Sequence, residues 1–154
     1  MDATLVKWMG IADANSGGFV HGGTVMKLCD EAAGLAAVRH TRRRCVTGGM
    51  DRMTFASRVD IGELLTLRAS VNAVWRTSME VGVRVEAENV RTGEIRHTST
   101  AYLTMVALDD DGRPVTVPPL EIDPDDPDGL RRQSEAQHRR ANRLAERDQF
   151  LSDR

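Results

Sequence analysis

The sequence predicts an α+β domain in which one long helix lies across a curved antiparallel sheet. Residues 24–40 are mostly apolar and small, over a length that suits a helix of about four turns. From Leu64 onward, apolar residues recur with a period of two through three segments separated by short turns. A single helix can bury its apolar face only against a sheet, and strands joined by short turns pair in antiparallel fashion.

The composition excludes several classes of protein. The chain has 154 residues, which suits one domain with one core, and its net charge of −2 gives no basic field for nucleic acid. The N-terminal residues do not form a signal peptide, and no apolar stretch is long enough to span a bilayer. The two cysteines, Cys29 and Cys45, match neither a disulfide framework nor a zinc pattern. We therefore expect a cytoplasmic protein without a metal or cofactor and with neither a nucleic-acid nor a membrane partner.

The first half of the chain predicts three elements around a glycine-rich loop. Residues 4–9 form a short strand, and residues 24–40 form the long helix after the loop. Alanines and a glycine along this helix are small enough for close approach to a sheet. Residues 45–55 read as a strand that contains two glycines.

The second half predicts three longer strands and a tail. Apolar and polar residues alternate from Leu64 to Trp75, again from residue 79 to 88, and residues 95–108 form the last strand. An acidic, proline-rich linker follows residue 120. We therefore divide the chain into a domain at 1–120 and a linker with a helical tail at 121–154. The helix starts near Pro127 and its apolar stripe is thin, which favours a solvated tail helix over a dedicated binding helix.

The glycine-rich loop before the long helix is not a nucleotide loop. It contains neither GxxxxGK[ST] nor GxGxxG after a long strand. Glycines before a helix do leave free N–H groups at its N-terminus, and these groups bind a phosphate or a developing oxyanion. This pattern alone is common and indicates no particular chemistry.

Asp30 is the residue in the helix that most needs an explanation. Its neighbours one turn away are Met26, Ala33 and Gly34, none of which can pair with its charge. A carboxylate in an apolar stripe is costly and is usually placed there for a partner or a reaction. Two interpretations remain open from the residues alone: a catalytic group, or a carboxylate that binds a loop amide or an arginine.

Three stretches together resemble a known family. They are "HGGTVMKLCDEAAGLAAVRH" at 21–40 with "NSGG" before it, "TFASRVDIGELLTLRASV", and "RTSMEVGVRVEAEN". They are similar to the hotdog-fold acyl-CoA thioesterases, nearest to the brain-type cytosolic acyl-CoA hydrolases and their bacterial broad-specificity relatives, over about residues 6–120. The resemblance implies a hotdog fold, in which a central helix is wrapped by the sheet. It also implies dimers joined edge to edge, often three to a hexamer.

The resemblance also implies a catalytic mechanism. In tandem relatives one hotdog supplies an asparagine and the other an aspartate, and this chain carries both, as Asn15 and Asp30. This implies a homodimer with two complete sites, each with Asn15 from the partner. The thioester carbonyl would accept a hydrogen bond from the Gly23 N–H, while Asp30 activates water or attacks directly.

Further residues are expected around the substrate, an acyl-CoA. His21 supports the loop, Phe55 lines a pocket, and Arg58 with the turn at 76–78 contacts phosphates and the nucleotide. The expected substrate-binding residues are His21, Gly22, Phe55, Arg58, Arg76, Thr77 and Ser78. The alternative function is a non-catalytic acyl-CoA-binding or sensing hotdog, against which the presence of both Asn15 and Asp30 argues. A hotdog hydratase is excluded because the D-x4-H pattern is absent.

Overall fold

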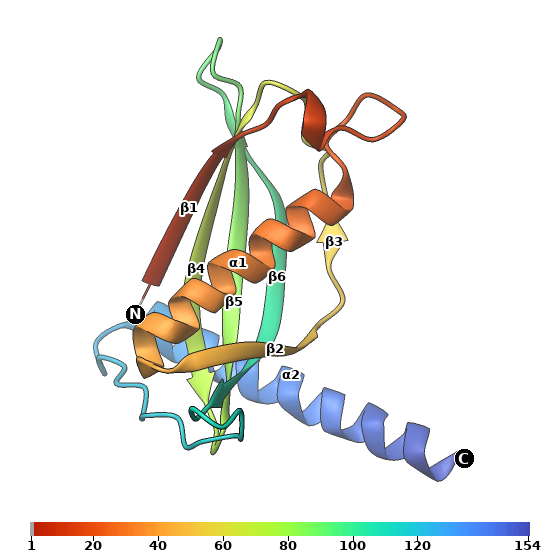
Figure 1. Cartoon of the computed structure of the whole chain (residues 1–154). Helices are drawn as coiled ribbons and strands as arrows, with labels where there is room; N and C mark the ends of the chain where they lie inside the picture. Colours follow the sequence, from red (N-terminus) through yellow and green to blue (C-terminus); the bar gives the residue numbers. More distant parts are fainter. Residues whose placement is uncertain (1) are drawn as a thin grey trace.

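A long helix, α1 (Gly22–Thr41), crosses one face of an antiparallel sheet (Figure 1). The computed structural model describes residues 2–154. The strand order is β1-β4-β5-β6-β2, and the short strand β3 also pairs with β6. The remaining elements are β1 (Asp2–Trp8), β2 (Arg44–Met50), β3 (Thr54–Phe55), β4 (Leu64–Val74), β5 (Ser78–Glu88), β6 (Ile95–Leu108), a 3-10 turn (Ile11–Asp13) and α2 (Pro127–Ser152). This arrangement confirms the predicted α+β hotdog fold.

Specific residues set the limits of α1. His21 is its N-cap, and the side-chain Nδ1 of His21 accepts a hydrogen bond from the Gly23 N–H at 2.9 Å. At the other end Arg42 adopts a left-handed conformation with φ 54°, and its N–H donates to the Val38 carbonyl at 2.7 Å. The helix buries mainly small residues, among them Ala32, Ala33, Ala36 and Ala37. Their small side chains let the helix backbone lie close to the sheet.

The core lies between α1 and the strands β4, β5 and β6. Residues that alternate along these strands face the helix, and pairs such as Leu67 with Val85 lie directly opposite each other. The period of two in the sequence predicted this row correctly. Its fully buried members include Leu65, Leu67, Val81, Val83, Val85 and Leu103.

The single strand predicted over 45–55 is wrong in one respect. It is two strands, β2 and β3, which both pair with β6 and are separated by residues 51–53. The register shifts between Thr47 and Gly49, so β2 is already irregular before it ends.

A second irregularity changes which side chains face the core. The register of β4 against β5 shifts between Val71 and Ala73, so Ala73 lies opposite Glu80, whereas an unbroken register would place it opposite Met79. Because a shift of one residue moves side chains to the other face, Ala73 and Trp75 leave the core row that the alternation predicted. The Trp75 indole instead donates a hydrogen bond to Gln137 of α2.

The prediction of a solvated tail helix is wrong for the first half of α2. This half packs on the face of the sheet opposite α1, and Gly129 and Ala136 are its buried residues. Residues 145–154 are all exposed, and in Figure 1 this part of the helix extends past the sheet. None of the helices in residues 2–154 is both long and apolar enough to cross a membrane.

Candidate active site

The N-terminus of α1 presents one open backbone amide. The loop before it is fixed because the His21 N–H donates to the Asp13 carbonyl at 2.7 Å and the Val20 N–H donates to the Val59 carbonyl at 2.9 Å. The Gly23 N–H, which the sequence assigned to the substrate carbonyl, is already bound to His21 Nδ1. Within residues 2–154 the Gly22 N–H has no hydrogen-bond acceptor. In this structure the N–H open to a ligand is therefore that of Gly22, while the His21 side chain occupies the Gly23 N–H that the sequence analysis assigned to the carbonyl.

The two side-chain atoms of the Asn15 amide have different surroundings. Its Oδ1 accepts hydrogen bonds from the Gly17 and Phe19 N–H groups at 2.9 and 3.2 Å, which closes a tight turn. Its Nδ2 makes no hydrogen bond to the residues that the structure describes, and the residue is exposed. The amide therefore has a donor available for a ligand while its oxygen serves the fold.

Asp30 is exposed and bound to a threonine. The expectation that it projects from a buried apolar stripe is wrong, because α1 buries Cys29 and Ala33 while Asp30 lies on the exposed flank beside them. The Thr47 hydroxyl of β2 donates to Asp30 Oδ1. Neither the loop amide nor the arginine considered as its partner is bound to it. The bond fixes one carboxylate oxygen, and Oδ2 has no partner among residues 2–154.

Thr47 was not identified by the sequence. It stands in a glycine-containing strand, and no spacing rule connects it to a carboxylate 17 residues earlier. Only the packing of β2 beside α1 brings the hydroxyl to Asp30.

Phe55 lies beside the N-terminus of α1, and Arg58 lies beside the loop that precedes it. The Phe55 ring lies 3.6 Å from the position that a Cβ on Gly22 would occupy. The Arg58 guanidinium stacks on the Phe19 ring at 4.1 Å and forms a 3.0 Å ion pair with Asp60. Phe55 therefore places an aromatic ring beside the open amide, and Arg58 places an exposed cation beside the loop before α1.

The turn at Arg76, Thr77 and Ser78 lies far from this point in the same chain. It joins the end of β4 to β5, whereas the loop just before α1 contacts residues 59–60, which precede β4. β4 has 11 residues, so its ends are about 35 Å apart. Within one chain, the structure does not bring the predicted nucleotide-binding turn to the helix N-terminus.

The segment under the helix N-terminus is held by a partly buried ion pair. Arg96 of β6 donates from Nη2 to Glu63 Oε1 at 2.8 Å and also binds the Arg58 carbonyl at 2.7 Å. The hydrogen bonds from Arg96 lower the pKa of the Glu63 carboxyl, and the Asp60 N–H adds to this effect. The pair fixes residues 58–63, on which the loop before α1 rests.

The open Gly22 amide and the Asp30 carboxylate lie far apart along α1. Gly22 and Asp30 are eight residues apart on one helix, which places them about 12 Å apart along its axis. A carboxylate that attacks a carbonyl, or activates water for it, must lie within about 3–3.5 Å of the reacting atoms. The Gly22 amide and Asp30 of one chain are therefore too far apart to act on the same thioester.

Comparison with known proteins identifies the family. The family model of the Thioesterase superfamily matches residues 17–94, which is half of the chain. The chain belongs to the thioesterase superfamily. This thioesterase-superfamily chain is 40% identical over 108 residues to protein VdlD of Helicobacter pylori, over 70% of the chain and 62% of the relative. It is 33% identical over 126 residues to the cytosolic acyl coenzyme A thioester hydrolase of Rattus norvegicus, over 80% of the chain and 33% of the relative. The chain thus spans less than two thirds of the length of either.

Two solved thioesterase structures cover nearly the whole chain. A hexameric acyl-CoA thioesterase aligns with a TM-score of 0.88 and 35% identity over 94% of this chain and 92% of its own. The acyl-CoA hydrolase of Staphylococcus aureus, solved with butyryl coenzyme A and coenzyme A, aligns with a TM-score of 0.85 and 28% identity over 98% and 93%. Variants of that hydrolase replace an asparagine, an aspartate and a threonine by alanine, at positions separated by 15 and 17 residues.

Proposed function

We propose that this protein hydrolyses acyl-CoA thioesters to a free carboxylic acid and coenzyme A. The observation that carries the proposal is the position of Asp30. Its carboxylate is exposed on α1 and accepts a hydrogen bond from the Thr47 hydroxyl, in a chain that belongs to the thioesterase superfamily. The separations of Asn15, Asp30 and Thr47 in this chain equal those of the three residues substituted in the Staphylococcus aureus hydrolase. That agreement supports catalytic or positioning roles for all three.

In the proposed reaction each residue has one task. The thioester carbonyl accepts a hydrogen bond from the open Gly22 N–H, where the dipole of α1 stabilises the developing negative charge. Asp30 removes a proton from the attacking water, or attacks the carbonyl itself to give an anhydride that water then opens. Asn15 donates its free Nδ2–H to the water or to the carbonyl. Both routes give the same products, and coenzyme A leaves as a thiolate that needs no strong acid.

The 12 Å between Gly22 and Asp30 supports a site shared by two chains. We propose that the helix N-terminus and Asn15 of one chain face Asp30 and Thr47 of a second chain in a two-fold dimer. Such a dimer contains two equivalent sites. In such a dimer the turn at residues 76–78 contacts the nucleotide of a substrate whose carbonyl lies at the helix N-terminus of the second chain.

Assembly and location follow as proposals from the relatives. The hexameric state of a neighbour with 35% identity supports a trimer of such dimers. The cytosolic relative supports a cytoplasmic location.

A thiol-release assay tests the function directly. Purified protein is mixed with acyl-CoAs of several chain lengths and a thiol-trapping dye, and steady release indicates hydrolysis. Asp30→Asn should lower kcat by about 10²–10⁴-fold, because general-base catalysis contributes that much. The variant should fold normally, since the asparagine oxygen can still accept the Thr47 hydroxyl. Glu31→Gln, which changes the adjacent exposed carboxylate, is the matched control and should retain full activity.

Two results would contradict the proposal. Near wild-type turnover in Asp30→Asn would remove Asp30 from the reaction. Tight acyl-CoA binding by the wild-type protein without thiol release at any chain length would instead support the acyl-CoA sensor.

A further inference from the structure

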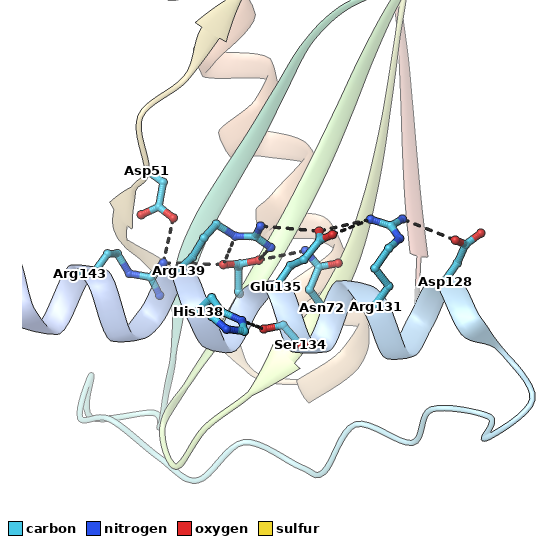
Figure 2. A network of polar contacts seen from close by, with 10 residues as sticks. Asp51, Asn72, Asp128, Arg131, Ser134, Glu135, His138, Arg139 and Arg143 are labelled. Atoms are coloured by element: carbon cyan, nitrogen blue, oxygen red, sulfur yellow. Dashed lines mark hydrogen bonds and ion pairs between the residues drawn. The ribbon is translucent and has the colours of Figure 1, made fainter.

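A polar network joins α2, Glu80 of β5 and the segment between β2 and β3 (Figure 2). At its centre is Glu80 of β5, which has no exposed surface. Arg139 of α2 donates to both oxygens of Glu80, at 3.0 and 2.7 Å, and stacks over the Tyr102 ring at 3.6 Å. A buried carboxylate requires such a paired cation, so this contact holds the first half of α2 in place.

Arg143, one turn further along α2, extends the network to residue 51. Its Nη1 lies 2.9 Å from Asp51 Oδ2 and 3.7 Å from Glu80 Oε2. The Asp51 N–H also donates to the Tyr102 carbonyl at 2.9 Å. Asp51 therefore has its backbone bound to β6 and its carboxylate bound to α2.

Asp51 lies between two residues of the candidate site. Thr47, which binds Asp30, is four residues before it, and Phe55, which lies beside Gly22, is four residues after it. β2 holds the Thr47 side of the segment, because Thr47 and its neighbours pair with β6 in regular register up to the bulge. The Phe55 side has much less support, since β3 consists of two residues. Asp51 directly follows Met50, the last residue of β2, so the contact with Arg143 anchors the start of the connection that leads to β3 and Phe55.

We propose that Arg143 and Asp51 are positioning residues that let α2 hold Phe55 beside the helix N-terminus, and so set the affinity for the acyl-CoA. The proposal rests on the proposed hydrolase function for its kinetic readout. Because Thr47 is fixed separately by β2, loss of the contact acts on substrate binding and leaves the chemical step nearly unchanged.

The test is a kinetic comparison of Arg143→Met with Arg143→Lys and Arg147→Met. Arg143→Met keeps the apolar stem of the side chain and removes the charge, and it should raise KM about five-fold with kcat within about two-fold. Arg143→Lys keeps a cation for Asp51 and should restore most of the loss. Arg147→Met, one turn further on an exposed side chain that pairs with Asp148, should have no effect.

A second readout is independent of activity. Backbone hydrogen exchange over residues 51–56 should be faster in Arg143→Met than in Arg147→Met, because the anchor at Asp51 is lost. Asp51→Ala removes the same contact from the other side and should reproduce both effects, while the double variant should add little to either single change. If Arg143→Met does not fold, the KM and the hydrogen exchange of the Asp51 variant test the positioning role instead.

Different failures have different meanings. Unchanged KM and unchanged exchange in a folded Arg143→Met protein would overturn the positioning role, as would additive effects in the double variant. A wild-type protein that hydrolyses no acyl-CoA would contradict the proposed function instead. In that case faster exchange over residues 51–56 would still support the anchor, and unchanged exchange would overturn it.

Discussion

A mixed dimer of two inactive variants should regain activity if each site is built from two chains. One chain carries Asn15→Asp, which removes the free Nδ2–H but keeps the oxygen that closes the turn through Gly17 and Phe19. The other carries Asp30→Ala, which removes the exposed carboxylate. Each homodimer has the same lesion in both sites, so each should be almost inactive.

The expected recovery follows from the geometry of α1. Gly22 and Asp30 of one chain are about 12 Å apart along the helix axis, so in the proposed shared site the Asn15 loop acts with Asp30 of the other chain. In a mixed dimer one site then collects both lesions and the other collects neither. Equal amounts of the two chains that pair at random give one half mixed dimers, so about a quarter of all sites should be intact.

The measurement is thiol release from co-expressed, differently tagged chains. Purification through both tags in sequence isolates the mixed dimers, in which about half of the sites should be intact. This step also supplies the control, because chains that do not exchange would imitate a negative result. Activity of co-purified dimers at the level of the separate homodimers would refute the shared site, and would place Asn15 and Asp30 of one chain in the same reaction.

Three further predictions concern the helix N-terminus, the segment below it and the buried thiol. In Gly23→Val the new Cβ would lie 3.0 Å from His21 Nδ1 and displace the cap. Both kcat/KM and the free energy of unfolding should therefore fall, the latter by about 1 kcal/mol. Full activity in a folded protein would show that the cap has no part in the site. Glu63→Gln should lower the free energy of unfolding at pH 7 by about 1–3 kcal/mol in urea titrations, because Arg96 loses its charged partner. The pKa of Glu63 is lower in the folded protein than its ordinary value of 4.5, so its contribution is present above pH 4.5 and is lost as the pH falls through the folded pKa; a difference between the two proteins that stays constant down to pH 3 would contradict this. Burial, and secondarily the Asp30 charge, raises the pKa of the Cys29 thiol to about 12. A thiol reagent at pH 8 should therefore not label Cys29 in the folded protein. Labelling as fast as in urea would show that the core opens.

The sequence by itself determined the architecture, because local patterns carry that information. The period of two in β4, β5 and β6 selects which residues face the helix, and the run of small residues in α1 requires a close surface. The glycine-rich loop before α1 and the lone carboxylate at Asp30 also marked the two ends of the candidate site. These features depend on residues that are near one another in the chain.

Only the tertiary structure decided how these residues meet. Thr47 reaches Asp30 because β2 packs beside α1, and the Gly22 amide is open because the His21 side chain turns back onto Gly23. Neither contact follows from a spacing, since each depends on where a neighbouring element or side chain comes to rest. The same holds for Asp30 itself, which a helical projection placed in an apolar stripe and the packed helix exposes.

The packing of α2 on the sheet is the feature that local sequence patterns predicted least well. The first half of α2 looked solvated because its apolar stripe is thin and one of its sheet-facing positions carries an arginine, Arg139. Arg139 is nevertheless bound there, because the buried carboxylate of Glu80 on β5 lies on that face of the sheet and accepts its hydrogen bonds. A charge buried on one element becomes a binding partner only once the fold has placed the opposite charge against it, and that placement is a property of the whole chain.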